Sequence, residues 1–199
     1  LSIIDLHERG TQPMVDPNSG NWLVYNGEIY NYIELRRELK NLGYKFSTET
    51  DTEVILTAFN AWGKAAFPRM NGMFAFCIFD RSRNELICVR DRYGIKPFYY
   101  SCDNEQFTFA SEIKPIIKVS KKHFKINKKT AFNYLVYGRT DYNNETFFRG
   151  LFNLSPGHYM ICNAKGLQAE KRWWNPPRKK SKPSLTFLKK IFQDSVKLR

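Results

Sequence analysis

Two short polar segments carry the residues best suited to chemistry. In the first, Asn26 and Gly27 follow an apolar run over residues 22–25, and Glu28 comes directly after them. An asparagine amide and a glycine N–H are two adjacent neutral donors, as an oxyanion hole requires. Glycine also lets a ligand approach the backbone closely, because it has no Cβ. The alternative is an ordinary connecting turn, since Asn-Gly pairs favour sharp turns.

The second segment is the polar stretch 47–53, which precedes an apolar helical pattern. Either Thr50 or Asp51 can cap that helix, because the side-chain oxygens of both residue types accept hydrogen bonds from backbone N–H groups in a helix's first turn. Asp51 has a second interpretation, as a carboxylate that receives the ammonium group of a substrate. The local sequence leaves both interpretations open.

The apolar periodicity predicts an α+β fold, with many strands and a few helices outside them. The expected strands lie over residues 1–6, 22–25, 44–46, 73–79, 85–89, 98–100 and 106–110, and a hairpin over 157–162 and 167–174. The Asn-Gly pair is expected to form a turn after the strand 22–25. One helix follows Asn31, with Glu34 as capping-box partner, and is ended by Gly43. Further helices are expected from residue 51 to Gly63, from 111 and over 130–137.

Composition excludes several classes of protein. The chain of 199 residues is 42% hydrophobic, so it can bury a sizeable core, yet no apolar run approaches the length of a membrane span. It has four cysteines, with no Cys-x-x-Cys pair, and its three histidines are scattered, which argues against a metal site. Such sparse, unpaired cysteine usage favours a reducing cytoplasm.

The net charge of +13 is unevenly distributed. Residues 1–111 hold 12 Lys and Arg against 14 Asp and Glu, whereas residues 112–199 hold 20 against 5. A basic second half with interleaved aromatic residues is compatible with nucleic-acid binding. It contains no recognisable nucleic-acid motif, so a solvated basic face, or a docking surface for another domain, is the preferred interpretation.

Composition also predicts a domain boundary. Residues 175–183 are rich in Pro, Lys and Arg and are expected to form a linker. After it, Ser184 can cap a helix with an apolar side, over residues 184–199. The chain begins with Leu1 and stops inside this helical pattern, so we expect it to be a piece of a longer protein. The expected organisation is one domain over 1–174, the linker, and the first helix of a second domain.

Seven segments of the chain point together to one family. In order, they are residues 1–6 (LSIIDL), 12–14 (QPM), 25–31 (YNGEIYN), 50–55 (TDTEVI), 70–76 (MNGMFAF), 90–97 (RDRYGIKP) and 109–114 (FASEIK). This set resembles the glutaminase domain of glutamine-hydrolysing asparagine synthetase, a class II glutamine amidotransferase. The resemblance covers essentially the whole chain. It implies the four-layer αββα sandwich of the N-terminal-nucleophile hydrolases.

The resemblance also implies a site. In this family a Cys at the mature N-terminus attacks the glutamine amide, and its own α-amino group acts as base. The Asn26 side chain and the Gly27 N–H would form the oxyanion hole, and Asp51 would receive the substrate α-ammonium. The residues implied to bind glutamine are Ile3, Ile4, Asn26, Gly27, Glu28 and Asp51.

The chain departs from the family pattern at its start. It begins one residue after the family's carboxylate-gripping Arg, and the nucleophilic Cys lies further upstream. None of Cys77, Cys88, Cys102 or Cys162 is N-terminal or lies in a family site motif, so none is expected to replace it. Residues 1–199 alone are therefore expected to be inactive and to lack the first strands of the fold. No cofactor is expected in them, with ATP and Mg²⁺ expected in the missing synthetase domain.

The resemblance predicts glutamine hydrolysis that supplies ammonia for ATP-dependent conversion of aspartate to asparagine. Two alternatives remain open: amidation of another carboxylate, such as one on a polysaccharide sugar, and a catalytically dead docking domain. The expected partners are glutamine and the chain's own synthetase domain, with a homodimer possible. Neither nucleic acid nor a membrane is an expected partner.

Overall fold

The computed structural model describes residues 10–103, 106–120, 122–140, 143–176 and 183–198. Its strands are β1 (Met14–Val15), β2 (Trp22–Ile29), β3 (Gly72–Asp80), β4 (Glu85–Arg90), β5 (Tyr99–Cys102), β6 (Phe107–Ala110), β7 (Phe152–Asn153), β8 (His158–Asn163), β9 (Gly166–Leu167) and β10 (Lys171–Arg172). Its helices are α1 (Tyr32–Asn41), α2 (Asp51–Trp62), the 3-10 helix η2 (Gly63–Arg69), α3 (Ile113–Val119), α4 (Lys128–Tyr137) and α5 (Leu185–Lys197).

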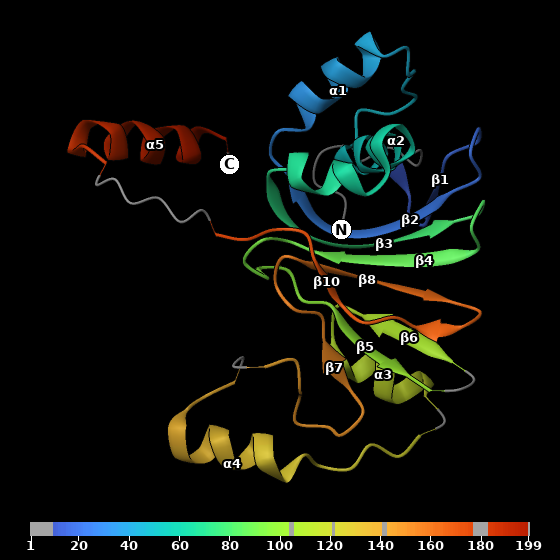
Figure 1. The fold of residues 1–199 in the computed structure, drawn as a ribbon, viewed down its shortest axis with the longest axis vertical. Coiled ribbons are helices and arrows are strands. Elements are labelled where there is room, and N and C mark those ends of the chain that lie inside the picture. Colours follow the sequence, from blue (N-terminus) through green and yellow to red (C-terminus); the bar gives the residue numbers. More distant parts are fainter. Residues whose placement is uncertain (1–9, 104–105, 121, 141–142, 177–182, 199) are drawn as a thin grey trace.

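These elements form four layers. The larger sheet has the order β1-β2-β3-β4-β8-β10, with β9 paired to β8, and the smaller sheet has the order β6-β5-β7. Helices α1 and α2 cover the outer face of the larger sheet, and α3 lies beyond the smaller sheet (Figure 1). The predicted α+β class and the αββα sandwich are therefore confirmed.

Strand β3 shows why two apolar layers form. Its side chains alternate between the faces of the larger sheet. Phe74, Phe76 and Ile78 belong to the core under the helices, whereas Ala75 and Cys77 belong to the core between the two sheets. A strand buried on both faces needs a nearly continuous apolar sequence, as predicted for residues 73–79.

The predicted turn at Asn26 and Gly27 is wrong, because both residues lie inside β2. All eight residues of β2 pair with β3 in an antiparallel ladder, from Trp22 opposite Phe79 to Ile29 opposite Gly72. Pairing with this long apolar partner satisfies backbone groups along the whole segment, and it overrides the local turn preference.

Two further local predictions fail. Residues 44–46 form no strand, and no strand in the described part of the chain pairs with them; Tyr44 and Phe46 pack instead against the core under the helices. Asn31 occupies the N-cap position of α1 without a capping hydrogen bond. Its side chain instead accepts from the Asn71 N–H at 2.8 Å and donates to the Arg69 carbonyl at 3.0 Å, tying α1 to the segment before β3.

Other local predictions are confirmed. Gly63 follows α2 with φ +56°, and Gly43 follows α1 with φ +92°. The hairpin 163–166 joins β8 to β9. Ser184 caps α5 by accepting from the Phe187 N–H at 3.2 Å. Within the residues described, no helix has both the length and the apolar character needed to cross a membrane.

Candidate active site

Strand β2 directs neighbouring side chains to opposite faces of the larger sheet. Tyr25 points toward the helices and belongs to the core beneath them. Asn26 points toward the smaller sheet, where its Nδ2 donates to the Ser111 hydroxyl at 3.2 Å. Ser111 directly follows β6, so the predicted oxyanion donor is oriented by a residue at the end of a strand of the smaller sheet.

The Asn26 side chain lies at a pocket between the two sheets, with a volume of about 180 Å³. Polar groups in its wall come from Gln12, Asn26 and Ser111, and the loop end Pro97–Phe98 closes another part of it. The side-chain Oε1 of Gln12 also accepts from the Tyr25 N–H at 2.6 Å. The pocket is therefore largely apolar, with an amide donor on its wall.

The edge of β2 turned away from β3 gathers further groups. The N–H groups of Tyr25 and Ile29 point to this edge, because they donate to Gln12 and to Asp51 rather than to β3. Backbone N–H groups alternate between the two edges of a strand. The Gly27 N–H, midway between them, therefore points to the same edge.

Gly27 must be a glycine for a structural reason as well. Its φ is +152°, and a Cβ built on it would lie 2.1 Å from the Met73 carbonyl oxygen. Gly72 on the partner strand has the matching constraint, because a Cβ built on it would lie 2.1 Å from the Glu28 carbonyl oxygen. Because Glu28 pairs with Met73, the two glycines let the backbones approach closely at this point.

Asp51 joins α2 to β2. It is the first residue of α2 and only 6% exposed. Its Oδ2 accepts from the Tyr25 hydroxyl at 2.7 Å and from the Ile29 N–H at 3.0 Å. Burial raises the pKa of the Asp51 carboxyl, and these two hydrogen bonds partly offset the increase. Thr50, not Asp51, caps α2, since its hydroxyl accepts from the Glu53 N–H at 3.1 Å.

The structure brings together only some of the predicted site residues. Asn26 faces the pocket between the sheets, whereas Asp51 lies on the helical side of β2 and does not line that pocket. Gly27 and Glu28 lie on β2 between Tyr25 and Ile29, the two residues that donate hydrogen bonds to Asp51. Ile3 and Ile4 lie outside the described residues.

One of the cysteines, Cys77, lines the same pocket as Asn26. Cys77 and Cys88 are buried opposite each other on β3 and β4, with their Sγ atoms 3.5 Å apart. Burial raises the pKa of the Cys88 thiol and that of the Cys162 thiol, which disfavours the reactive thiolate at both positions. Among the residues described, no group of three His, Cys, Asp or Glu is placed to hold a metal ion.

Sequence reasoning missed two supporting residues, Tyr25 and Arg36. Tyr25 is identifiable once β2 is known to continue to Ile29, because alternation then places it with Leu23 on the helical face. Arg36 lies next to Leu35 on the buried side of α1, and a charged residue beside the apolar positions of a helix is a signal that can be found in the sequence.

Comparison with known proteins now identifies the family. The family described as "Glutamine amidotransferase domain" matches residues 1–174. The chain belongs to the glutamine amidotransferase family. Among its relatives is asparagine synthetase [glutamine-hydrolyzing] 3 of Bacillus subtilis, 33% identical over 98% of this chain and 33% of the relative.

Other members of the family extend the comparison. Asparagine synthetase [glutamine-hydrolyzing] 1 of the same organism is 43% identical over 69% of this chain and 21% of its own length. The amidase chry2 of Gibberella zeae is 33% identical over 88% of this chain and 25% of its own. This chain therefore spans a third or less of these relatives.

A solved structure confirms the fold. The glutamine phosphoribosylpyrophosphate amidotransferase of B. subtilis superposes with a TM-score of 0.56 at 22% identity, over 83% of this chain and 32% of that one. The two chains therefore share one fold over this region.

Proposed function

We propose that this chain is the glutaminase part of an asparagine synthetase, which releases ammonia from glutamine for the amidation of aspartate. The observation that carries the proposal is the pair of donors on β2: the Asn26 amide on one face and the Gly27 N–H on the strand edge. Family membership supports glutamine as the substrate.

In the proposed reaction, a cysteine thiolate from outside residues 1–199 attacks the carboxamide carbon of glutamine. A carbon–sulfur bond forms, and the carbonyl electron pair moves onto the oxygen, which Asn26 and Gly27 stabilise. Collapse of this intermediate breaks the carbon–nitrogen bond. The α-amino group of the cysteine, which took the proton of the thiol, gives that proton to the leaving nitrogen, and ammonia is released. Water then hydrolyses the thioester to glutamate.

Asp51 binds the α-ammonium of glutamine in this proposal. A carboxylate near the edge of β2 complements that charge, and the contacts with Tyr25 and Ile29 fix its position. Residues 175–183 are the linker, and α5 begins a synthetase domain that binds ATP and Mg²⁺. The four free cysteines support a cytoplasmic protein.

The experiment compares two variants in the full-length protein. Asn26→Ala should lower the rate of glutamine hydrolysis by about 10²–10³-fold, because one oxyanion donor is lost. Asp51→Ala should damage glutamine-dependent synthesis by weakening glutamine binding. Both variants should retain ammonia-dependent asparagine synthesis, which bypasses the glutaminase site.

An unchanged rate in Asn26→Ala would place the oxyanion hole elsewhere. Equal loss of glutamine- and ammonia-dependent synthesis in Asp51→Ala would show that Asp51 mainly holds the fold together. A full-length wild type that releases no glutamate from glutamine would contradict the proposed activity itself.

A further inference from the structure

Arg36 is a charged residue in a buried position of α1. Only 6% of it is exposed. Its guanidinium reaches across to the segment between α1 and α2, where Nη1 donates to the Thr48 carbonyl at 2.5 Å and Nη2 to the Thr50 carbonyl at 2.9 Å. The carboxylate of Glu49, itself largely exposed, lies 3.4 Å from Nη1. The guanidinium also stacks over the Phe46 ring, 4.7 Å from its centre.

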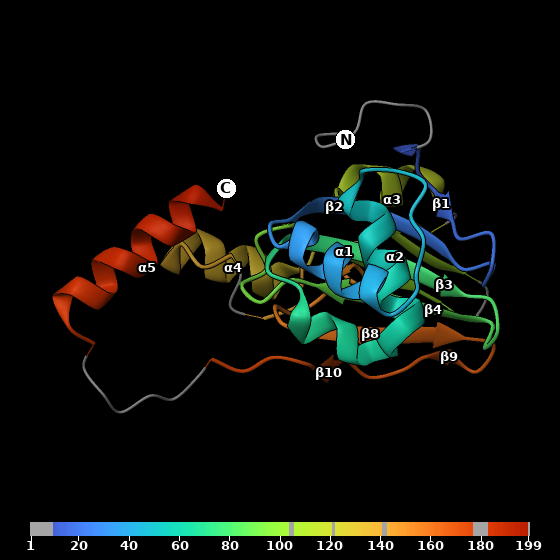
Figure 2. The same cartoon turned by 90° about the horizontal axis from the view of Figure 1, so that it is seen from above.

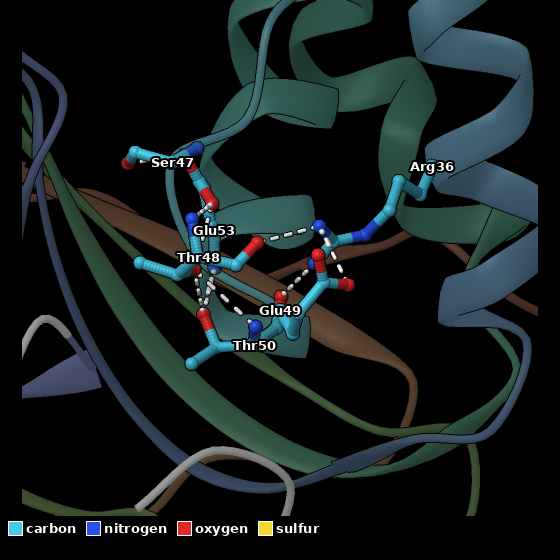
Figure 3. A network of polar contacts seen from close by, with 6 residues as sticks. All are labelled: Arg36, Ser47, Thr48, Glu49, Thr50 and Glu53. Carbon is cyan, nitrogen blue, oxygen red and sulfur yellow. Dashed lines mark hydrogen bonds and ion pairs between the residues drawn. The ribbon is translucent and has the colours of Figure 1, made fainter. Parts of the chain in front are cut away.

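Glu53 holds the same segment from the other side. Its Oε1 accepts from the N–H and hydroxyl of Ser47, at 2.8 and 2.9 Å. Its Oε2 accepts from the N–H and hydroxyl of Thr48, both at 2.7 Å. Figure 3 shows the result: Arg36 binds the carbonyl groups of Thr48 and Thr50, and Glu53 binds the N–H groups of Ser47 and Thr48.

This segment ends at the proposed substrate ligand. The carbonyl of Thr50 and the N–H of Asp51 belong to one planar peptide unit. By binding the Thr50 carbonyl, Arg36 fixes the orientation of the peptide that carries Asp51. The Asp51 carboxylate is then anchored at its other end by Tyr25 and Ile29.

An apolar side chain would suit this face of α1 better on stability grounds. Desolvating a guanidinium is costly, and the Arg36 Nε is buried without a hydrogen-bond partner among the described residues. The planar fork of arginine can, however, bind two carbonyl groups in a fixed geometry, which neither an apolar residue nor lysine can do.

We propose that Arg36 is a positioning residue for glutamine binding, which holds Asp51 at the edge of β2 through the Thr48 and Thr50 carbonyls. The inference rests on the proposed function. Arg36 itself touches no substrate, so its loss should weaken binding of glutamine more than it slows the chemical step.

The test is Arg36→Met in the full-length protein, with steady-state glutamine hydrolysis and thermal unfolding measured together. The KM for glutamine should rise about tenfold while kcat changes less than about twofold, the pattern expected when ground-state and transition-state binding are lost equally. Arg36→Lys should give a smaller rise in KM, because it keeps the charge without the fork. It also serves as the second variant if Arg36→Met does not fold.

Two controls separate positioning from general stability. Arg37→Met makes the same chemical change at an exposed neighbour on α1 and should alter neither property. Leu39→Ala removes a fully buried side chain of the same helix but none of the polar atoms of Arg36 and Glu53 that bind residues 47–50, so it should lower the unfolding temperature but leave KM unchanged.

An unchanged KM in both Arg36 variants would overturn the inference, as would an equal rise in KM for Leu39→Ala. These outcomes leave the proposed function intact, because wild type would still hydrolyse glutamine. A wild type without glutaminase activity overturns the proposed function and this inference together.

Discussion

Tyr25 and Asp51 form a buried polar pair that links a strand to a helix. Asp51 makes Tyr25 harder to ionise: burial and the Asp51 charge raise the pKa of the Tyr25 hydroxyl far above its ordinary value. The Tyr25 hydroxyl in turn donates to the Asp51 carboxylate and limits the increase in the pKa of Asp51. The pair is thus both a packing contact and a control on the charge at the candidate site.

The raised pKa of Asp51 predicts a pH dependence of stability. The folded state holds this proton more tightly than the unfolded state, so the contribution to the free energy of unfolding is greatest below the ordinary value of 3.8 and is lost as pH rises through the raised pKa. In Asp51→Asn, which has no carboxyl to titrate at this position, this decrease in the free energy of unfolding with rising pH should be absent. Each tenfold change in the ionisation constant corresponds to about 1.4 kcal/mol.

Urea unfolding of wild type and Asp51→Asn, from about pH 4 to about pH 7, measures this difference. Tyr25→Phe is the matched control: it removes a hydrogen bond that lowers the pKa of Asp51, so the loss of stability should extend to higher pH. Parallel pH profiles for wild type and Asp51→Asn would contradict the argument.

At the scale of elements, the close approach of β2 and β3 defines the site. Gly27 and Gly72 flank the pair Glu28–Met73, and neither position has room for a Cβ. The pairing of β2 with β3 can therefore continue to Ile29. As a result, the Asn26 amide and the Gly27 N–H lie on the same strand as Ile29, whose N–H binds Asp51 at the start of α2. A turn at residues 26–27 would have ended the strand before it reached Asp51.

Gly72→Ala should destabilise the protein by about 1–3 kcal/mol, because the new Cβ would lie 2.1 Å from the Glu28 carbonyl oxygen and the strands would have to separate. Urea unfolding gives the change in free energy.

The control is Gly138, which has φ +64° and no atom within 4 Å of a built Cβ. Gly138→Asn should be nearly neutral, because asparagine tolerates the left-handed region, whereas Gly72→Asn should be at least as damaging as Gly72→Ala. Equal tolerance at the two positions would refute the steric argument.

At the scale of the whole molecule, the C-terminal region has two parts with different roles. Strand β10 pairs with β8, and Trp173 next to it stacks on Phe74 with ring centres 6.1 Å apart. Helix α5, by contrast, has no buried side chain and stands apart from the sheets in both views (Figures 1 and 2). Its exposed apolar side includes Leu185, Leu188, Ile191, Phe192 and Val196.

A chain ending at residue 176 should therefore melt within about 2 °C of residues 1–199, since it loses no buried contact of α5. A chain ending at residue 168 loses β10 and Trp173, whose Nε1 donates to the Arg90 and His158 carbonyls at 3.2 Å. It should melt several degrees lower, at about 2–4 °C per kcal/mol for a domain of this size. Calorimetry of the two chains measures both changes, and equal melting temperatures would show that β10 does not stabilise the fold.

The sequence by itself predicted the α+β class and most helix boundaries, and its motifs pointed to a family whose fold implied the four layers. These depend on local chemistry: the apolar run of β3, the Gly residues after α1 and α2, and motifs such as residues 25–31 and 50–55. Its resemblance to the family also implied a candidate site of Ile3, Ile4, Asn26, Gly27, Glu28 and Asp51, whose roles as glutamine ligands remain predictions.

Only the tertiary structure decided how those residues are arranged. Asn26 and Gly27 lie in a strand because β3, far along the chain, pairs with all of β2, and no local propensity encodes such a pairing. The pairing sends the Asn26 side chain to the smaller sheet and leaves Asp51 on the helical side. Arg36 and Tyr25 gained their roles in the same way, because their partners come from other elements brought close by the packing of α1, α2 and β2.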